Sequence, residues 1–149
     1  MREISGLVKG QYALLLGAIT YKGAPVLVYD EIVPISAVAP YIIIANINSN
    51  PSITTNTNYI RQVVVLLDIV TSYEGPYGGK TDCLAITDLV FGIMIPGRPM
   101  DAKPLNLGSN FKVITTTVQN ETSMSHMNDT RMIVRNLVRI QHIIEQRNN

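Results

Sequence analysis

Residues 40–47 read PYIIIANI and residues 59–70 read YIRQVVVLLDIV, and both segments predict β-strands. They are rich in Ile, Val and Tyr, whose side chains fit a pleated and buried surface. Within the second segment, the run Val63–Leu67 is continuously apolar, which is typical of a central strand covered on both faces. Residues 48–58 between the two segments are almost entirely Asn, Ser and Thr, and this composition predicts a polar loop.

A turn and a helix are expected after the second strand. Residues 75–79 read GPYGG and predict a flexible turn. Thr81 is a suitable N-cap for the helix that follows, and Asp82 is favourable in its first turn, whereas Asp88 is expected on a solvated face with Asp82. The Pro-Gly pair at 96–97 ends the helix. The apolar stripe of this helix consists of Cys83, Ile86, Leu89, Val90, Ile93 and Met94.

The N-terminal residues predict another helix. From Arg2 to Thr20, apolar side chains recur at spacings of three and four, which gives one apolar face. The glycines in this segment weaken the helix by about 1 kcal/mol each relative to Ala. The apolar run Tyr12–Ile19 is too short to span a membrane. Residues 22–25 read KGAP and end the helix, and Val26–Tyr29 is expected to be a short strand.

The last forty residues predict a long C-terminal β-hairpin. Phe111–Thr122 contains Thr-Thr-Thr-Val, which favours a strand, and Ser123–Asp129 is expected to be a polar turn. From Thr130 onward, two periods compete. A strand would place on one side Met132, Val134, Val138, Ile140 and Ile144, and on the other Arg131, Arg135, Arg139, Gln141 and Glu145. A helix would instead group Ile133, Leu137, Ile140 and Ile144. The density of Val and Ile favours the strand.

The expected order of elements is α-β-β-β-α-β-β, in one α+β domain that spans residues 1–149. One mixed or antiparallel sheet is flanked by the N-terminal helix and the central helix. Charged residues make up only 15% of the chain and hydrophobic residues 46%. This composition fits a subunit that buries apolar surface against other subunits, and it fits a well-filled core equally well. The net charge of +1 gives no bulk electrostatic reason to expect nucleic-acid binding.

No catalytic residue, cofactor site or metal site is expected. His126, His142 and the single Cys83 occur without an HxH, HExxH or CxxC pattern, and His126 is expected in a solvated loop. Cys83 falls on the apolar stripe of a helix, where a packed thiol is far commoner than a nucleophile. Asp68 interrupts an apolar strand. It is either a general base or, as we favour, an outward residue near a strand end or the partner of a basic side chain.

Residues 75–81, GPYGGKT, support an alternative function, a small nucleotide-binding or hydrolytic domain. The segment follows a strand, opens a helix and nearly matches the phosphate-loop pattern GxxxxGK[ST]. However, the spacing between Gly75 and Gly79 is one residue short, and Pro76 removes one of the amides that would cradle a phosphate. A Walker B acid on a later parallel strand is also missing. We therefore disfavour nucleotide binding.

Arg131, Arg135 and Arg139 form a periodic basic row. Such a row faces DNA phosphates or an acidic partner, or it is the solvated face of an edge strand, where charge prevents unwanted pairing. No aromatic platform for stacking bases accompanies it, because the chain has no Trp and two Phe. The three arginines are the candidate lumen-facing, DNA-facing or interface residues.

Two short signatures stand out, GAPVLVY at residues 23–29 and APYIII at residues 39–44. An amphipathic helix precedes them, and the polar segment, a long strand over 61–70, the helix over 81–94 and a closing strand pair follow. In this order and in these signatures the chain resembles the bacteriophage tail-terminator, or tail-completion, proteins of head–tail joining. It departs from that family in its long C-terminal hairpin with the arginine row and in a longer loop at 96–109.

The resemblance implies a non-enzymatic structural protein of the virion. Members of the family form a ring, typically of six subunits, that stops growth of the tail tube and docks to the head connector, with DNA passing through its centre. The implied partners are further copies of the chain, in a hexamer or a higher symmetry, the tail tube, portal-side connector proteins and passing DNA, with no membrane and no cofactor. The implied location is the virion tail or neck, after assembly in the host cytoplasm. A host adaptor subunit of a secretion or contractile assembly is a third interpretation.

Overall fold

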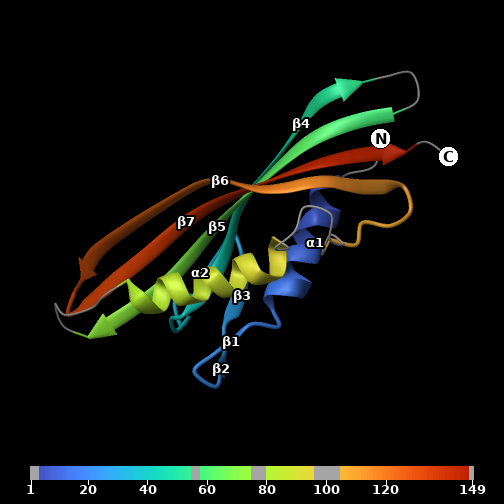
Figure 1. Cartoon of the computed structure of the whole chain (residues 1–149). Helices are drawn as coiled ribbons and strands as arrows, with labels where there is room; N and C mark the ends of the chain where they lie inside the picture. Colours follow the sequence, from blue (N-terminus) through green and yellow to red (C-terminus); the bar gives the residue numbers. More distant parts are fainter. Residues whose placement is uncertain (1–3, 55–57, 75–79, 96–104, 148–149) are drawn as a thin grey trace.

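The computed structural model describes residues 4–54, 58–74, 80–95 and 105–147. It has the expected α+β fold, with two helices and a five-stranded sheet (Figure 1). A short hairpin of two two-residue strands, β1 and β2, was not expected from the sequence. The elements are α1 (Ile4–Leu16), β1 (Thr20–Tyr21), β2 (Ala24–Pro25), β3 (Leu27–Asp30), β4 (Tyr41–Thr54), β5 (Asn58–Glu74), α2 (Thr81–Met94), β6 (Phe111–Asn128) and β7 (Arg131–Arg147).

The five-stranded sheet has the order β3-β4-β5-β7-β6. Strand β3 runs parallel to β4, and the other three pairs are antiparallel. The C-terminal hairpin is confirmed, and it is longer than expected. Strand β6 continues to Asn128, so the polar turn predicted at Ser123–Asp129 is wrong. The segment can remain a strand because its backbone pairs with β7, while its Ser, Met and His side chains stay mostly in solvent.

The prediction of a polar loop at residues 48–58 is also wrong for most of that segment. Strand β4 continues to Thr54 and β5 begins at Asn58, and only residues 55–57 lie outside the described part of the chain. Asn46, Asn48 and Asn50 point to solvent, and the residues between them are half-buried. This alternation with a period of two is that of a strand. Pairing with β5 supplies the backbone hydrogen bonds, and these do not depend on which side chains the segment carries.

Both helices cover the same face of the sheet, as Figure 1 shows. On that face, the β5 side chains Val63, Val65, Leu67 and Ile69 are fully buried with apolar residues of α1, α2 and β7. Their neighbours Val64 and Leu66 point to the other face, and Val64 is only half-buried. The expectation that the apolar run Val63–Leu67 is covered on both faces is therefore wrong for the described chain.

Helix α2 spans the residues predicted for it, but its N-cap is Lys80, without a side-chain cap, rather than Thr81. Asp82 lies in the first turn as expected, yet it is not simply solvated. It accepts a hydrogen bond from Tyr21 at 2.5 Å and forms an ion pair with Lys22 at 3.3 Å. The hydrogen bond from Tyr21 lowers the pKa of Asp82, with further contributions from Tyr73 and Lys22. This carboxylate ties the start of α2 to the β1–β2 hairpin.

A buried polar contact joins α1 to the C-terminal hairpin. The Tyr12 hydroxyl of α1 lies 2.5 Å from Nε2 of His142 on β7, and the Thr116 hydroxyl of β6 lies 2.8 Å from its Nδ1. The two rings of Tyr12 and His142 also meet edge to face, with centroids 5.6 Å apart. Burial lowers the pKa of His142 from 6.5 to about 4. The imidazole is therefore neutral at physiological pH, and it can donate through one nitrogen and accept through the other.

We predict that the protein loses stability in acid because of His142. Its folded-state pKa lies below the unfolded value, so the unfolded chain binds more protons between about pH 4 and pH 6.5, and stability falls as the pH drops through that window. The expected loss between about pH 7.5 and pH 5 is on the order of 2 kcal/mol. Urea unfolding at both pH values measures it. The loss should largely disappear in His142→Gln and persist in His126→Gln, which removes an exposed histidine of β6.

Candidate assembly surfaces

We call the sheet face opposite the helices the open face. It carries the side chains that alternate with the buried core along each long strand. Tyr29 and Tyr41 meet edge to face near one side of it, with ring centroids 5.6 Å apart. Aliphatic side chains of this face lie between long polar side chains, and many of the aliphatic ones are only half-buried. Its central residues are Ile43, Asn46, Val64, Leu66, Asp68, Val70, Ile133, Arg135, Leu137, Arg139, Gln141 and Ile143.

All three predicted arginines lie on the open face, because β7 is a strand and they are spaced by even numbers along it. Arg131 donates a hydrogen bond to the Ser72 hydroxyl at 3.0 Å and contacts Glu74 at 3.5 Å. Arg139 is exposed and has no hydrogen bond or ion pair with any described residue. Among the described residues, Arg131 thus has side-chain partners and Arg139 has none.

Arg135, the middle arginine, is held by Asp68 of β5. Its Nη1 lies 3.1 Å from Asp68 Oδ2, and the Asp68 side chain is 8% exposed against 34% for Arg135. Burial raises the pKa of Asp68, and the positive charge of Arg135 partly opposes that shift. The second carboxylate oxygen has no partner among the described residues. The interpretation of Asp68 as the partner of a basic side chain is therefore confirmed.

The connection between β3 and β4, residues 31–40, is called the apolar loop. It presents Ile32 and Val38 at 82% and 78% exposure, and Ile35 is fully exposed. The base of the loop lies on the open face, where Ala37 and Ala39 line a hollow of about 370 Å³ together with Val70 and Ile133. This exposed loop was not expected from the sequence. Its signal is present in EIVPISAVA at residues 31–39, an apolar run broken by Pro34 and outside any predicted strand.

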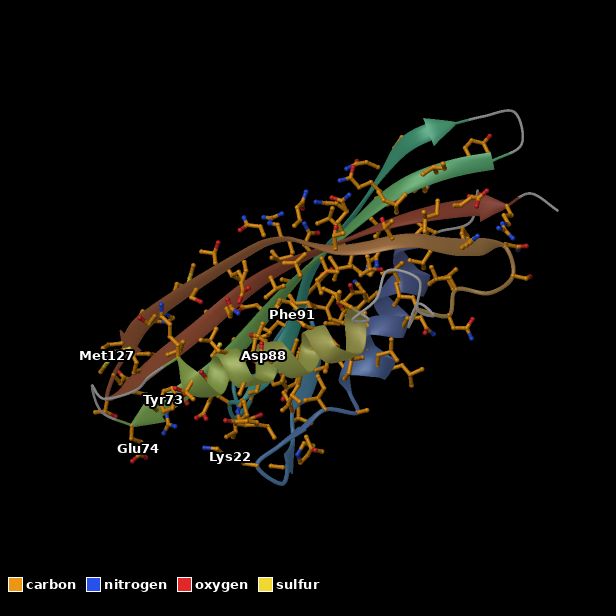
Figure 2. The ribbon with its side chains drawn as sticks, viewed as in Figure 1. Lys22, Tyr73, Glu74, Asp88, Phe91 and Met127 are labelled. Atoms are coloured by element: carbon orange, nitrogen blue, oxygen red, sulfur yellow. The ribbon has the colours of Figure 1, made fainter. Side chains whose placement is uncertain are left out.

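Two other candidates from the sequence, Cys83 and Asp88, lie apart from this surface. Cys83 is a buried residue of α2, with its thiol 3.4 Å from the Ile69 carbonyl oxygen, and burial raises the pKa of the thiol to about 11. Asp88 is exposed on α2 (Figure 2). The glycine turn at 75–79 lies outside the described residues. Among those described, no three His, Cys, Asp or Glu side chains are grouped in a way that could hold a metal ion.

We predict that Arg135→Gln destabilises the fold by about 2 kcal/mol, because it leaves the buried Asp68 carboxylate without its counter-charge; the value lies below that of a fully buried pair because Arg135 is partly exposed. Without Arg135, the folded state holds the Asp68 proton more tightly than the unfolded chain does. The stability that Arg135→Gln loses should therefore become smaller as the pH falls toward about 4.

Urea unfolding of Arg135→Gln, of Asp68→Asn and of the double variant measures this coupling. The double variant should recover most of the stability that Arg135→Gln loses. Arg139→Gln on the same face is the matched control and should change stability by less than about 0.5 kcal/mol. An equal loss for Arg135→Gln at pH 7 and pH 4 would show that the arginine acts through packing and not through Asp68.

The sequence was compared with protein-family models and with curated proteins. No protein-family model matches the sequence, and no curated protein matches it significantly. Neither helix in the described part of the chain has the length and hydropathy needed to cross a bilayer.

Proposed function

We propose that this chain is a structural subunit of a bacteriophage neck or tail. Copies of it form a ring at the head-proximal end of the tail, where the ring ends the tail and joins it to the head connector. The proposal follows the resemblance in element order and signatures. One observation carries it beyond that resemblance, namely the exposure of Ile32, Ile35 and Val38 on the apolar loop.

Three large aliphatic side chains exposed within ten residues favour a protein partner. Single exposed aliphatic residues are ordinary on soluble proteins, whereas a cluster marks an interaction surface. Full burial of one such side chain contributes about 1.5–3 kcal/mol. A partner that covers the apolar loop therefore gains several kcal/mol of binding free energy from these residues alone. A structural subunit has such partners permanently, which is how it can keep this surface.

The position of the apolar loop is compatible with a ring. The loop borders the β3–β4 side of the sheet, and β6 forms the opposite side. A contact between the loop of one copy and a different surface of the next copy is heterologous. Heterologous contacts form rings when the rotation between copies closes, and open filaments when it does not.

The arginine row supports a role beside passing DNA. Arg131 and Arg139 are exposed on the open face, and they carry positive charge without a base-reading aromatic platform. Such charges bind phosphates independently of sequence and with strong salt dependence. This chemistry suits a channel that DNA must slide through, since tight or sequence-specific contacts would stop its movement.

The apolar loop gives the first test. We predict that the purified chain forms a closed ring, alone or with tail-tube and connector proteins, and that the triple variant Ile32→Ser, Ile35→Ser, Val38→Ser stays monomeric with an unchanged melting temperature. Light scattering across concentration and negative-stain images measure this. Leu14→Ser removes an exposed leucine of α1 and is the matched control, which should still assemble. A chain that stays monomeric with every virion partner contradicts the proposed function.

The arginine row gives the second test. We predict that Arg131→Ser with Arg139→Ser keeps the ring intact and weakens its binding of duplex DNA. The salt dependence should become shallower by about one unit of slope for each arginine that no longer neutralises a phosphate. Arg135 is left in place because it neutralises Asp68. Fluorescence anisotropy at several salt concentrations measures the effect. Lys80→Ser, at the exposed start of α2, should leave both affinity and slope unchanged.

A further inference from the structure

Strand β6 leaves a long backbone edge open. It is 18 residues long and pairs with β7 on one side, and no described strand lies on its other side. Edge strands are usually short or protected by charges and prolines. Strand β6 has no proline and only two charged residues, Lys112 and Glu121, although it is bulged beside Ile114 and Gln119. Its unpaired amides and carbonyls can be satisfied by another extended backbone.

A second open edge lies on the opposite side of the same sheet. Strand β3 pairs only with Tyr41–Ile44, so the rest of β4 has β5 on one side and no described strand on the other. This free part, residues 46–54, reads NINSNPSIT and contains no charged residue. Asn46–Pro51 keeps a regular register with β5, and the next bulge follows Pro51. One chain therefore carries two open edges with few or no charges, and the regular part of the β4 edge ends at Pro51.

The directions of the strands allow these two edges to pair with each other. Because β4 is antiparallel to β5, β5 to β7 and β7 to β6, strand β6 runs opposite to β4. A second copy placed beside the first can thus extend the sheet as an antiparallel ladder, with the helices of both copies on the same face. Antiparallel ladders have hydrogen bonds perpendicular to the strands and are slightly more stable per residue than parallel ones.

The register shows which residues would meet. Thr117 of β6 is opposite Gln141 of β7, Gln141 is opposite Val64 of β5, and Val64 is opposite Asn48 of β4. Thr117 and Asn48 thus lie in one row across the sheet, at its two sides. Both are exposed, and both belong to the open face.

We infer that the edge of β6 around Thr117 in one subunit pairs with the Asn46–Pro51 edge of β4 in the next. This inference rests on the proposed function and names the surface that would close the ring. Pairing of β6 with β6 about a two-fold axis would leave both β4 edges open, whereas head-to-tail pairing satisfies both edges of every copy. Since the helices add bulk to one face, the continuous sheet would curve with the helices outside, and the arginine row would face the lumen.

Disulfide trapping tests the pairing without disturbing the core. Thr117→Cys is combined in turn with Asn46→Cys, Asn48→Cys and Asn50→Cys, all at exposed positions of the open face, so that a small stagger between copies is covered. The parent Cys83 is buried and is not expected to react. After mild oxidation, at least one double variant should give a ladder of covalent dimers, trimers and higher species up to the ring size. Thr117→Cys alone should give no covalent dimer.

Three outcomes contradict the inference, and they separate it from the proposed function. Covalent dimers of Thr117→Cys alone would show two-fold pairing of β6. Rings seen by light scattering and negative stain, with no cross-link in any double variant, would retain the proposed function and remove edge pairing. A chain that stays monomeric and uncross-linked, also with tube and connector proteins, would remove both. Unchanged melting temperatures of the variants exclude misfolding as the cause.

Discussion

The burial of one side of β5 under two helices is the constraint on which the rest of this structure depends. Val63, Val65, Leu67 and Ile69 point into the only large apolar core of the described chain, and both α1 and α2 are used to cover it. No further helix of the described residues remains for the other face. The sheet therefore keeps an open face and two open sides, and these surfaces determine what the chain can do.

Polar groups inside the helix-covered layer fix how the C-terminal hairpin sits on that core. Asn136 of β7 donates hydrogen bonds to Thr87 of α2 at 2.9 Å and to Glu121 of β6 at 2.8 Å. Together with the contact of His142 to α1 and β6, this network links both helices to both strands of the hairpin. Because a buried polar group without its partner is costly, such contacts disfavour a slipped hairpin register more strongly than aliphatic packing does.

The sequence was sufficient to predict the elements whose apolar residues form a clear pattern. It was insufficient where pairing with a neighbouring strand decides that a polar segment becomes a strand. The helix at 81–94 follows from its periodicity, and the strand character of 131–147 follows from its density of Val and Ile, because its periodicity fits a helix as well. By contrast, 48–54 and 123–128 are strands made largely of Asn, Ser, Thr, Met and His, because a long neighbouring strand supplies their hydrogen bonds. The arginines could be assigned to one face once β7 was a strand. The apolar loop could not be predicted from the periodicity of apolar residues, since it belongs to no helix or strand.

The ladder between β5 and β7 has a kinetic consequence. Its closest pair in sequence, Glu74 and Arg131, is separated by 57 residues, and every other pair of the ladder is farther apart. A large entropy of loop closure must be overcome before any of these contacts forms, so the contact order is high and folding is expected to be slow. Strand β7 is also the last part of the described chain to be synthesised. The apolar central strand therefore stays without one neighbour until residues 131–147 have been synthesised, and the nascent chain is exposed to aggregation for all of that time.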